Sequence, residues 1–323
     1  MTRGIQAGVA SQASATVPEN FQEPPSAGDG EAVDSVYLCQ VGEGVSCGAC
    51  CGLYNTAEPS ETRLESMLRE RTEAFAGVPR TIDGIDDFRM RIEGWTPEDR
   101  PFPQFHHCAF LGLVGEKGQR VGCLLHPEAQ GNDGVDWRGL SYYGGLACRS
   151  YFCPSVRLLH PRWLMALRQA FDHWYLYGLI VTERALLTAF FDEIEARIGR
   201  PVIAKDFASG TTAARLLRSF AALKIGWPYR RKDAFGPCNY FFENGEYPRP
   251  EVELHAGHFS SSRYETIFRE LESAFRSEEM IADAEAELEV LFMQVAAVLE
   301  GGCEMQEAGR RGARDGAPGQ APR

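Results

Sequence analysis

The chain has 323 residues, 44% of them hydrophobic, which is enough apolar material for one large domain or two modest ones and argues against disorder throughout. Lysine and arginine total 33 against 45 for aspartate and glutamate, a net charge of −12. Because a surplus of negative charge repels phosphate backbones, we expect no nucleic-acid partner.

The start of the chain lacks the features of an export signal. Residues 1–10 include Arg3 but no apolar core of the kind that a secretory signal needs. The most apolar later run, Tyr175 to Val181, is much shorter than the roughly 20 residues that cross a bilayer. We therefore predict a cytoplasmic location, no membrane partner, and cysteines that stay reduced because the cytosol opposes disulfides.

The ten cysteines are distributed unevenly along the chain. Eight of them lie between Cys39 and Cys153, and only Cys238 and Cys303 follow. The first and last segments are rich in small and polar residues and hold too little apolar material to offset the entropy of ordering. The predicted segments are a disordered N-terminal arm (1–34), a cysteine-cluster metal-binding domain (35–157), a helical domain (158–303) and a disordered tail (304–323).

Two segments after the first cysteines carry regular apolar patterns. Ser60 is a favoured helix cap, and the apolar residues at three- and four-residue spacings that predict a helix after it are Leu64, Met67, Leu68 and Phe75. Further on, Phe88, Met90 and Ile92 alternate with charged residues, which is the period of a half-buried strand. The sequence therefore predicts a helix followed by a strand.

The next pattern is that of a hairpin. Two apolar runs, 108–114 and 119–125, flank the residues Gly115-Glu116-Lys117-Gly118. Apolar runs around a turn that contains glycine predict a β-hairpin. We expect this turn to bring Cys108 close to Cys123.

The remaining part of the chain is patterned for helices. Apolar stripes with helical spacing occur at 186–194, 216–220, 264–275 and 281–299. Gly199 and Pro201 are a conventional stop for the first of these helices, and Gly301-Gly302 ends the last. We interpret the stripes as faces that build a core. The predicted fold is mainly α, with a small irregular α+β cysteine-rich metal-binding domain that contains the β-hairpin.

The densest chemical signal is the motif Cys47-Gly48-Ala49-Cys50-Cys51. Two residues between Cys47 and Cys50 let the chain fold back, so that both sulfurs can reach one ion at about 2.3 Å, and Gly48 permits the turn. Consecutive side chains diverge, so Cys50 and Cys51 do not easily serve the same tetrahedral ion. They serve two neighbouring metals or two sides of a cluster, or one of them is a buried or reactive bystander.

Eight cysteines are candidate metal ligands, a number sufficient for two four-thiolate sites although nothing requires all of them to bind: Cys39, Cys47, Cys50, Cys51, Cys108, Cys123, Cys148 and Cys153. Separated thiols that folding brings together suit both zinc and iron–sulfur centres, so the identity of the cofactor stays open. His106, His107 and His126 lie close in sequence, and single histidines of this kind more often pack than bind metal. His126 is the best of them, because its spacing from Cys123 is that of a metal-binding turn.

These motifs resemble the YkgJ-type cysteine-cluster family, a zinc- or iron-chelating domain whose signature is C-x-x-C-x-x-C-C followed by further single cysteines. Cys47, Cys50 and Cys51 match the last three positions of the opening motif, and the later matches are Cys108-Ala109-Phe110-Leu111, Gly122-Cys123 and Cys148-Arg149. The matches span residues 47–149, about a third of the chain. Gly44 stands where the family has its first cysteine, so Cys39, Cys153 or His126 would replace that ligand.

Three functions are compatible with these features. The first is a metal-binding module in which the ion holds a loop-rich segment together. The second is an iron–sulfur enzyme in redox or group transfer; the resemblance extends to flagellin lysine methylating proteins with a similar cluster and so implies protein lysine methylation. Common nucleotide-binding and nucleophile motifs are absent from the sequence, so we assign no catalytic residue. The third is an interaction scaffold in which the helical half binds a protein partner through aromatic residues, unless these are buried: Trp163, Phe171, Trp174 and Tyr175.

Overall fold

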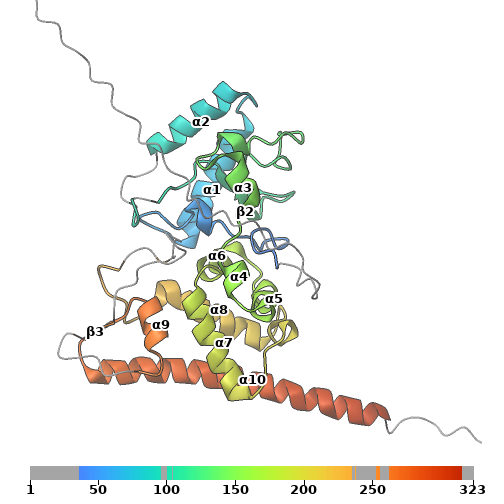
Figure 1. The fold of residues 1–323 in the computed structure, drawn as a ribbon, viewed down its shortest axis with the longest axis vertical. Coiled ribbons are helices and arrows are strands. Elements are labelled where there is room, and N and C mark those ends of the chain that lie inside the picture. The colour runs from blue at the N-terminus through green and yellow to red at the C-terminus, as the bar shows by residue number, and fades with distance from the viewer. Residues whose placement is uncertain are drawn as a thin grey trace, which may run out of the picture. The chain divides into compact units, whose positions relative to one another are not determined.

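The computed structural model describes residues 36–95, 100–103, 105–234, 237, 252–254 and 262–314. These residues contain ten α-helices and a two-stranded antiparallel sheet, so the fold is mainly α with a small α+β part, as predicted (Figure 1). The predicted N-terminal arm, 1–34, lies outside the described residues, as does the end of the predicted tail, 315–323.

The first two helices follow the cysteine motif. Helix α1, Glu61–Ala76, begins directly after Ser60 as predicted, and it buries Leu64, Leu68 and Phe75. Helix α2, Ile82–Trp95, occupies the segment for which we predicted a strand, so that prediction is wrong. The residues buried from this segment are Ile85, Phe88 and Ile92, at helical spacings of three and four, whereas Met90 is 53% exposed.

The predicted hairpin is present. Strand β1, Leu111–Val114, pairs antiparallel with β2, Arg120–Cys123, and Leu111 lies opposite Cys123. Gly115 and Gly118 both have positive φ angles, 87° and 58°, which the turn requires and which glycine adopts without strain. Helix α1 packs on β1, where the backbone N–H of Leu113 donates to Thr72 Oγ1 at 2.7 Å.

The later elements are mostly helices. Their bounds are α3 Gly144–Ser150, α4 Ser155–Leu158, α5 Pro161–Ala170, α6 Trp174–Ile180, α7 Arg184–Ile198, α8 Thr212–Gly226, α9 Glu265–Glu270 and α10 Glu278–Arg314. Short 3-10 helices occupy Ala49–Cys51, Arg138–Leu140 and Ala204–Phe207, and the two-residue strands β3 (Glu253–Leu254) and β4 (Ala274–Phe275) pair in parallel. The long helix α10 packs against α7 and α8 (Figure 1).

The ends of these helices agree only in part with the sequence patterns. Helix α7 ends at Gly199, in the left-handed conformation, as predicted. Helix α9 is shorter than the predicted stripe, because Glu272 adopts a positive φ of 55° and the chain then enters β4. The predicted end at Gly301-Gly302 is wrong: the α10 backbone continues to Arg314, into the segment predicted as a tail. Glycine inside a helix costs only about 1 kcal/mol relative to alanine, so it does not by itself stop one.

Two hydrophobic cores meet at α6. Tyr177 and Ile180 of this helix belong to a core built mainly from α5, α7, α8, α9 and α10, whereas Trp174 and Leu179 belong to a core around α1, α2 and the hairpin. The hydroxyl of Tyr54 ties the second core to α6 by donating to the backbone carbonyl of Tyr175 at 2.8 Å. The predicted boundary between 35–157 and 158–303 stays a prediction, and α6 contributes to both sides of it.

The aromatic residues considered for a docking face are buried. None is more than 8% exposed, and they pack in the two cores: Trp163, Phe171, Trp174 and Tyr175. An interaction surface formed by these four side chains is therefore ruled out. Within the described ranges, none of the helices combines the length and the apolar character that a bilayer crossing requires.

Candidate metal centre

The motif from Cys47 to Cys51 forms a tight turn. The backbone N–H of Ala49 donates to Cys47 Sγ at 3.4 Å, and a 3-10 helix covers Ala49–Cys51. Gly52 then reverses the chain with a positive φ of 80°. A Cβ at Gly52 would stand 2.1 Å from the backbone oxygen of His106, so only glycine fits here.

This close approach predicts the effect of one substitution. Gly52→Ala is expected to lower the free energy of unfolding by about 1–3 kcal/mol, because the clash is with backbone and no side-chain rotation relieves it. Gly42→Ala is a matched control in the same region, since a Cβ there meets nothing within 4 Å. Urea unfolding of both variants measures the difference. Equal stabilities for the two would contradict the packing described here.

Backbone hydrogen bonds attach two further cysteine segments to this turn. The N–H of Cys47 donates to the carbonyl of Cys39 at 2.9 Å, and the flanking residues Gln40 and Ser46 form a β-bridge. On the other side of the motif, the N–H of Cys108 donates to the carbonyl of Cys51 at 2.9 Å. The motif therefore sits between the Cys39 segment and the Cys108 segment.

The last three cysteines come from the hairpin and from the segment around α3. Cys123 ends β2 opposite Leu111. Cys148 lies on α3, is exposed, and its Sγ is 3.1 Å from Ser141 Oγ. Cys153 follows α3 and is buried. All eight predicted ligands are free thiols.

Four of the sulfurs influence one another's ionisation: Cys39, Cys47, Cys50 and Cys153. Burial raises the pKa of Cys39 to about 12, and the sulfurs of Cys50 and Cys153 add to the rise. Burial also raises the pKa of Cys47, and the other three sulfurs add to it. The geometry agrees with one shared region, because the Cys47 N–H bonds the carbonyl of Cys39, Cys50 lies in the same turn as Cys47, and Phe152, next to Cys153, meets the ring of Tyr37.

A second group of sulfurs consists of Cys51, Cys108, Cys123 and Cys148. Burial raises the pKa of Cys123 to about 12, and Cys108 and Cys148 add to the rise. Burial raises the pKa of Cys108 to about 11, where Cys148 adds to the rise and the Arg71 guanidinium opposes it. Cys108 and Cys123 also raise the pKa of Cys51. The structure thus brings these four thiols near one another.

The adjacent thiols of Cys50 and Cys51 affect each other's ionisation. The neighbouring Cys51 lowers the pKa of Cys50, and Cys50 raises the pKa of Cys51. Backbone N–H groups of both residues further stabilise the Cys50 thiolate. Cys50 is therefore the more acidic member of the pair and the natural place for a thiolate.

A backbone N–H two residues after the cysteine affects the ionisation of four thiols. These N–H groups belong to Ala49 for Cys47, where the hydrogen bond is 3.4 Å long, Phe110 for Cys108, Leu125 for Cys123 and Ser155 for Cys153. Each N–H lowers the pKa of its thiol against the larger, opposite effect of burial. A thiol is a weak acceptor and a thiolate is a much better one, so these N–H groups suit sulfurs that bind a metal.

Cationic and hydroxyl groups stand beside the sulfurs as well. Burial raises the pKa of Cys153 to about 11, and the Ser155 hydroxyl opposes the rise although it is buried and has no well-formed hydrogen bond. The charge of Arg184 also lowers the pKa of Cys153, and the charge of Arg138 lowers the pKa of Cys123. Groups that stabilise negative sulfur are what metal thiolates need around them.

His107 has a structural role. Its Nε2 lies 2.9 Å from Arg71 Nη1 and its Nδ1 lies 2.7 Å from the carbonyl oxygen of Gly52. Arginine only donates, so Nε2 accepts and Nδ1–H donates to the carbonyl. Burial and the Arg71 charge lower the pKa of His107 to about 3, which keeps the ring neutral. Both nitrogens are engaged, so His107 is not available as a ligand.

The other two histidines also have contacts of their own. His106 stacks on Tyr142, with ring centroids 4.8 Å apart, and its buried Nδ1 has no hydrogen-bond partner. His126 accepts the backbone N–H of Glu128 at Nδ1, at 3.2 Å. Burial lowers the pKa of His126, and the charged groups acting on it are Arg138, Glu128 and Asp136. These contacts give no support to His126 as the replacement ligand.

The thiols are grouped but not in ligating positions. In the described part of the chain, no three histidine, cysteine, aspartate or glutamate side chains are close enough together to hold a metal ion as they stand. The donor set nevertheless fits a soft metal, because buried and partly buried sulfurs come together from several segments of the chain. Cys39, Cys47, Cys50 and Cys153 would hold it on one side of the motif, with Cys51, Cys108, Cys123 and Cys148 on the other.

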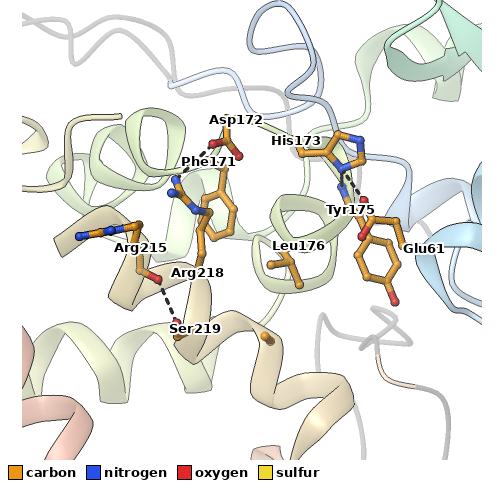
Figure 2. Close-up of a pocket in the computed structure, with 10 residues that line it drawn as sticks. Glu61, Phe171, Asp172, His173, Tyr175, Leu176, Arg215, Arg218 and Ser219 are labelled. Carbon is orange, nitrogen blue, oxygen red and sulfur yellow. Dashed lines mark hydrogen bonds and ion pairs between the residues drawn. The ribbon is translucent and has the colours of Figure 1, made fainter. Parts of the chain in front are cut away.

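A separate pocket of about 500 Å³ was not predicted (Figure 2). Arg218 lies 3.6 Å from Asp172, and His173 Nδ1 lies 3.0 Å from Glu61 Oε1. The residues around the pocket are Glu61, Phe171, Asp172, His173, Tyr175, Leu176, Arg215, Arg218, Ser219 and Ala222. The volume is within the range of small-molecule sites. The signal of this pocket in the sequence is the pair Arg215 and Arg218, one turn apart on α8. Charged helix faces of this kind are usually exposed to solvent, so the pair by itself does not predict a pocket.

The replacement for the missing family cysteine has a geometric aspect. At Gly44 the φ angle is 79°, and a Cβ would stand 2.9 Å from the carbonyl oxygen of Asp172, so a cysteine side chain does not fit there. Cys39 lies beside Cys47 instead, since the Cys47 N–H bonds its carbonyl at 2.9 Å. No protein-family model, no curated protein and no solved structure matches this chain, so the resemblance to the YkgJ-type family rests on the cysteine motifs alone.

Proposed function

We propose that this protein binds zinc or an iron–sulfur centre through a cysteine cluster made of Cys39, Cys47, Cys50, Cys51, Cys108, Cys123, Cys148 and Cys153. The metal holds together a region that has little regular structure of its own around the sulfurs. In that region the cysteines lie in loops, in one turn of 3-10 helix, at the end of a four-residue strand and on a two-turn helix.

The observation that carries this proposal is the convergence of sulfurs from distant parts of the chain. The N–H of Cys108 bonds the carbonyl of Cys51, and the hairpin brings Cys123 opposite Leu111, three residues after Cys108, although fifteen positions separate the two cysteines. Ordinary packing does not require several buried thiols to gather with N–H donors directed at them.

Metal analysis of the full chain, purified without oxygen, tests this proposal. We expect zinc in stoichiometric amount with no visible colour, or iron with inorganic sulfide and a brown colour that air bleaches. Cys108→Ala is expected to lower the bound metal, because Cys108 is buried and its backbone is bonded directly to Cys51 of the motif.

Cys303→Ala is the matched control, because this cysteine lies outside the predicted ligand set. It should retain the full metal content of the unmodified protein. The proposal fails if the reduced protein contains no metal and takes up none when zinc, or iron with sulfide, is supplied under nitrogen.

A further inference from the structure

The geometry points to two neighbouring four-thiolate centres rather than one, which deepens the proposed function and rests on it. We propose that the cluster divides between Cys50 and Cys51, the two adjacent cysteines of the motif. The first centre consists of Cys39, Cys47, Cys50 and Cys153, and the second of Cys51, Cys108, Cys123 and Cys148.

The first centre is assembled on the N-terminal side of the motif. The N–H of Cys47 bonds the carbonyl of Cys39 at 2.9 Å, which places these two residues side by side. The ring of Phe152, next to Cys153, meets the ring of Tyr37 edge-on with centroids 6.5 Å apart. The segment of Cys153 is therefore held against the segment of Cys39.

The second centre is assembled on the C-terminal side of the motif. The N–H of Cys108 bonds the carbonyl of Cys51 at 2.9 Å. The hairpin then places Cys123 opposite Leu111, and the N–H of Leu124 bonds the carbonyl of Phe110 at 2.9 Å. Cys51, Cys108 and Cys123 are thus connected through their own backbones.

Cys148 is assigned to the second centre by its surroundings. The N–H of Trp137 bonds the carbonyl of Leu125, two residues after Cys123, at 3.1 Å, and the next residue, Arg138, donates from Nη1 to the carbonyl of Cys148 at 3.5 Å. Cys148 is the exposed member of the set, on the outer helix α3, whereas the other three are buried or partly buried. We expect it to be the most readily exchanged ligand of the cluster.

The division at Cys50 and Cys51 has a geometric cause. A tetrahedral metal needs four sulfurs at about 2.3 Å, and the side chains of consecutive residues point in different directions. Cys50 follows the turn at Cys47, whose N–H bonds the Cys39 segment, whereas the carbonyl of Cys51 accepts the N–H of Cys108. The backbone therefore attaches the two sides of this pair to different cysteine segments.

Two arginines lie beside the second centre. A divalent metal with four thiolates has a net charge of −2, which nearby positive charge stabilises. Arg71 donates from Nη1 to the carbonyl of Cys108 at 3.1 Å, and Arg138 donates from Nη1 to the carbonyl of Cys148 at 3.5 Å.

Titration of the reduced, metal-free full chain with cobalt(II) tests the division. The sulfur-to-cobalt absorption is expected to saturate at two equivalents, and cadmium-113 should give two resonances of tetrathiolate type. Cys39→Ala should lose one equivalent and one resonance, and Cys123→Ala should lose one equivalent and the other resonance. Far-ultraviolet circular dichroism checks that each variant remains folded.

The double variant Cys39→Ala/Cys123→Ala should bind no cobalt tightly, and the Cys303→Ala control should bind two equivalents. Saturation at one equivalent, or loss of both equivalents from Cys39→Ala alone, would overturn the division and leave the proposed function standing. Binding of neither cobalt nor cadmium to the unmodified chain would overturn the division, and if the chain also took up no iron with sulfide the proposed function would be overturned with it.

Discussion

Removal of the metal is expected to release amide protection around the cysteine cluster while the helices α7, α8 and α10 stay protected. Binding free energy at a structural thiolate site is folding free energy, of order 10 kcal/mol. The helical core does not depend on it, because Phe190, Phe220 and Phe292 of these three helices are fully buried against one another. The two regions should therefore respond differently to a chelator.

Hydrogen exchange measured by mass spectrometry, on the reduced protein with and without a strong chelator, gives the result segment by segment. Peptides that cover residues 38–54 and 105–125 should lose protection, and those from α7 should not. Helix α6 is an informative intermediate, because Tyr54 from the cluster side bonds the carbonyl of Tyr175. Unchanged protection at residues 38–54 after complete removal of the metal would contradict a structural role.

Lys224→Met is expected to lower the free energy of unfolding by about 3–5 kcal/mol. Lys224 Nζ lies 2.9 Å from Glu183 Oε2, and the two side chains are only 2% and 0% exposed. The ammonium also donates to the carbonyl of Glu270 at 3.2 Å. Removing the cation leaves a carboxylate in a low-dielectric interior, and that desolvation cost is the source of the effect.

Urea unfolding of the matched variants separates the charge effect from lost packing. The double variant Lys224→Met/Glu183→Leu should be more stable than Lys224→Met alone, because an apolar pair of similar size removes the buried charge altogether. Lys205→Met, at an exposed position, is expected to change stability by no more than about 0.5 kcal/mol. If the double variant were less stable than Lys224→Met, the Lys224–Glu183 ion pair would stabilise the fold by more than the neutralisation of its two buried charges.

Helical and hairpin elements with a single clear period could be predicted from the sequence. The stripe before Gly199 and the turn at Gly115 and Gly118 specify local conformations that do not depend on distant residues. Helix α2 was mispredicted because Phe88 and Ile92 fit both a strand period of two and a helical spacing of four. Ile85, buried three positions earlier, distinguishes the two patterns, and Met90 is on the exposed side.

Spacing along the chain was sufficient to select the eight cysteines and to anticipate that Cys50 and Cys51 face different neighbours, because both inferences depend on local geometry. Only the tertiary structure decided three other features, because each depends on the packing of distant segments. These are the sorting of the sulfurs into groups, the hydrogen bonds at both nitrogens of His107, and the burial of Trp174 in the core. These features depend on which loops meet across α6 and the hairpin, and no sequence period encodes contacts between residues so far apart.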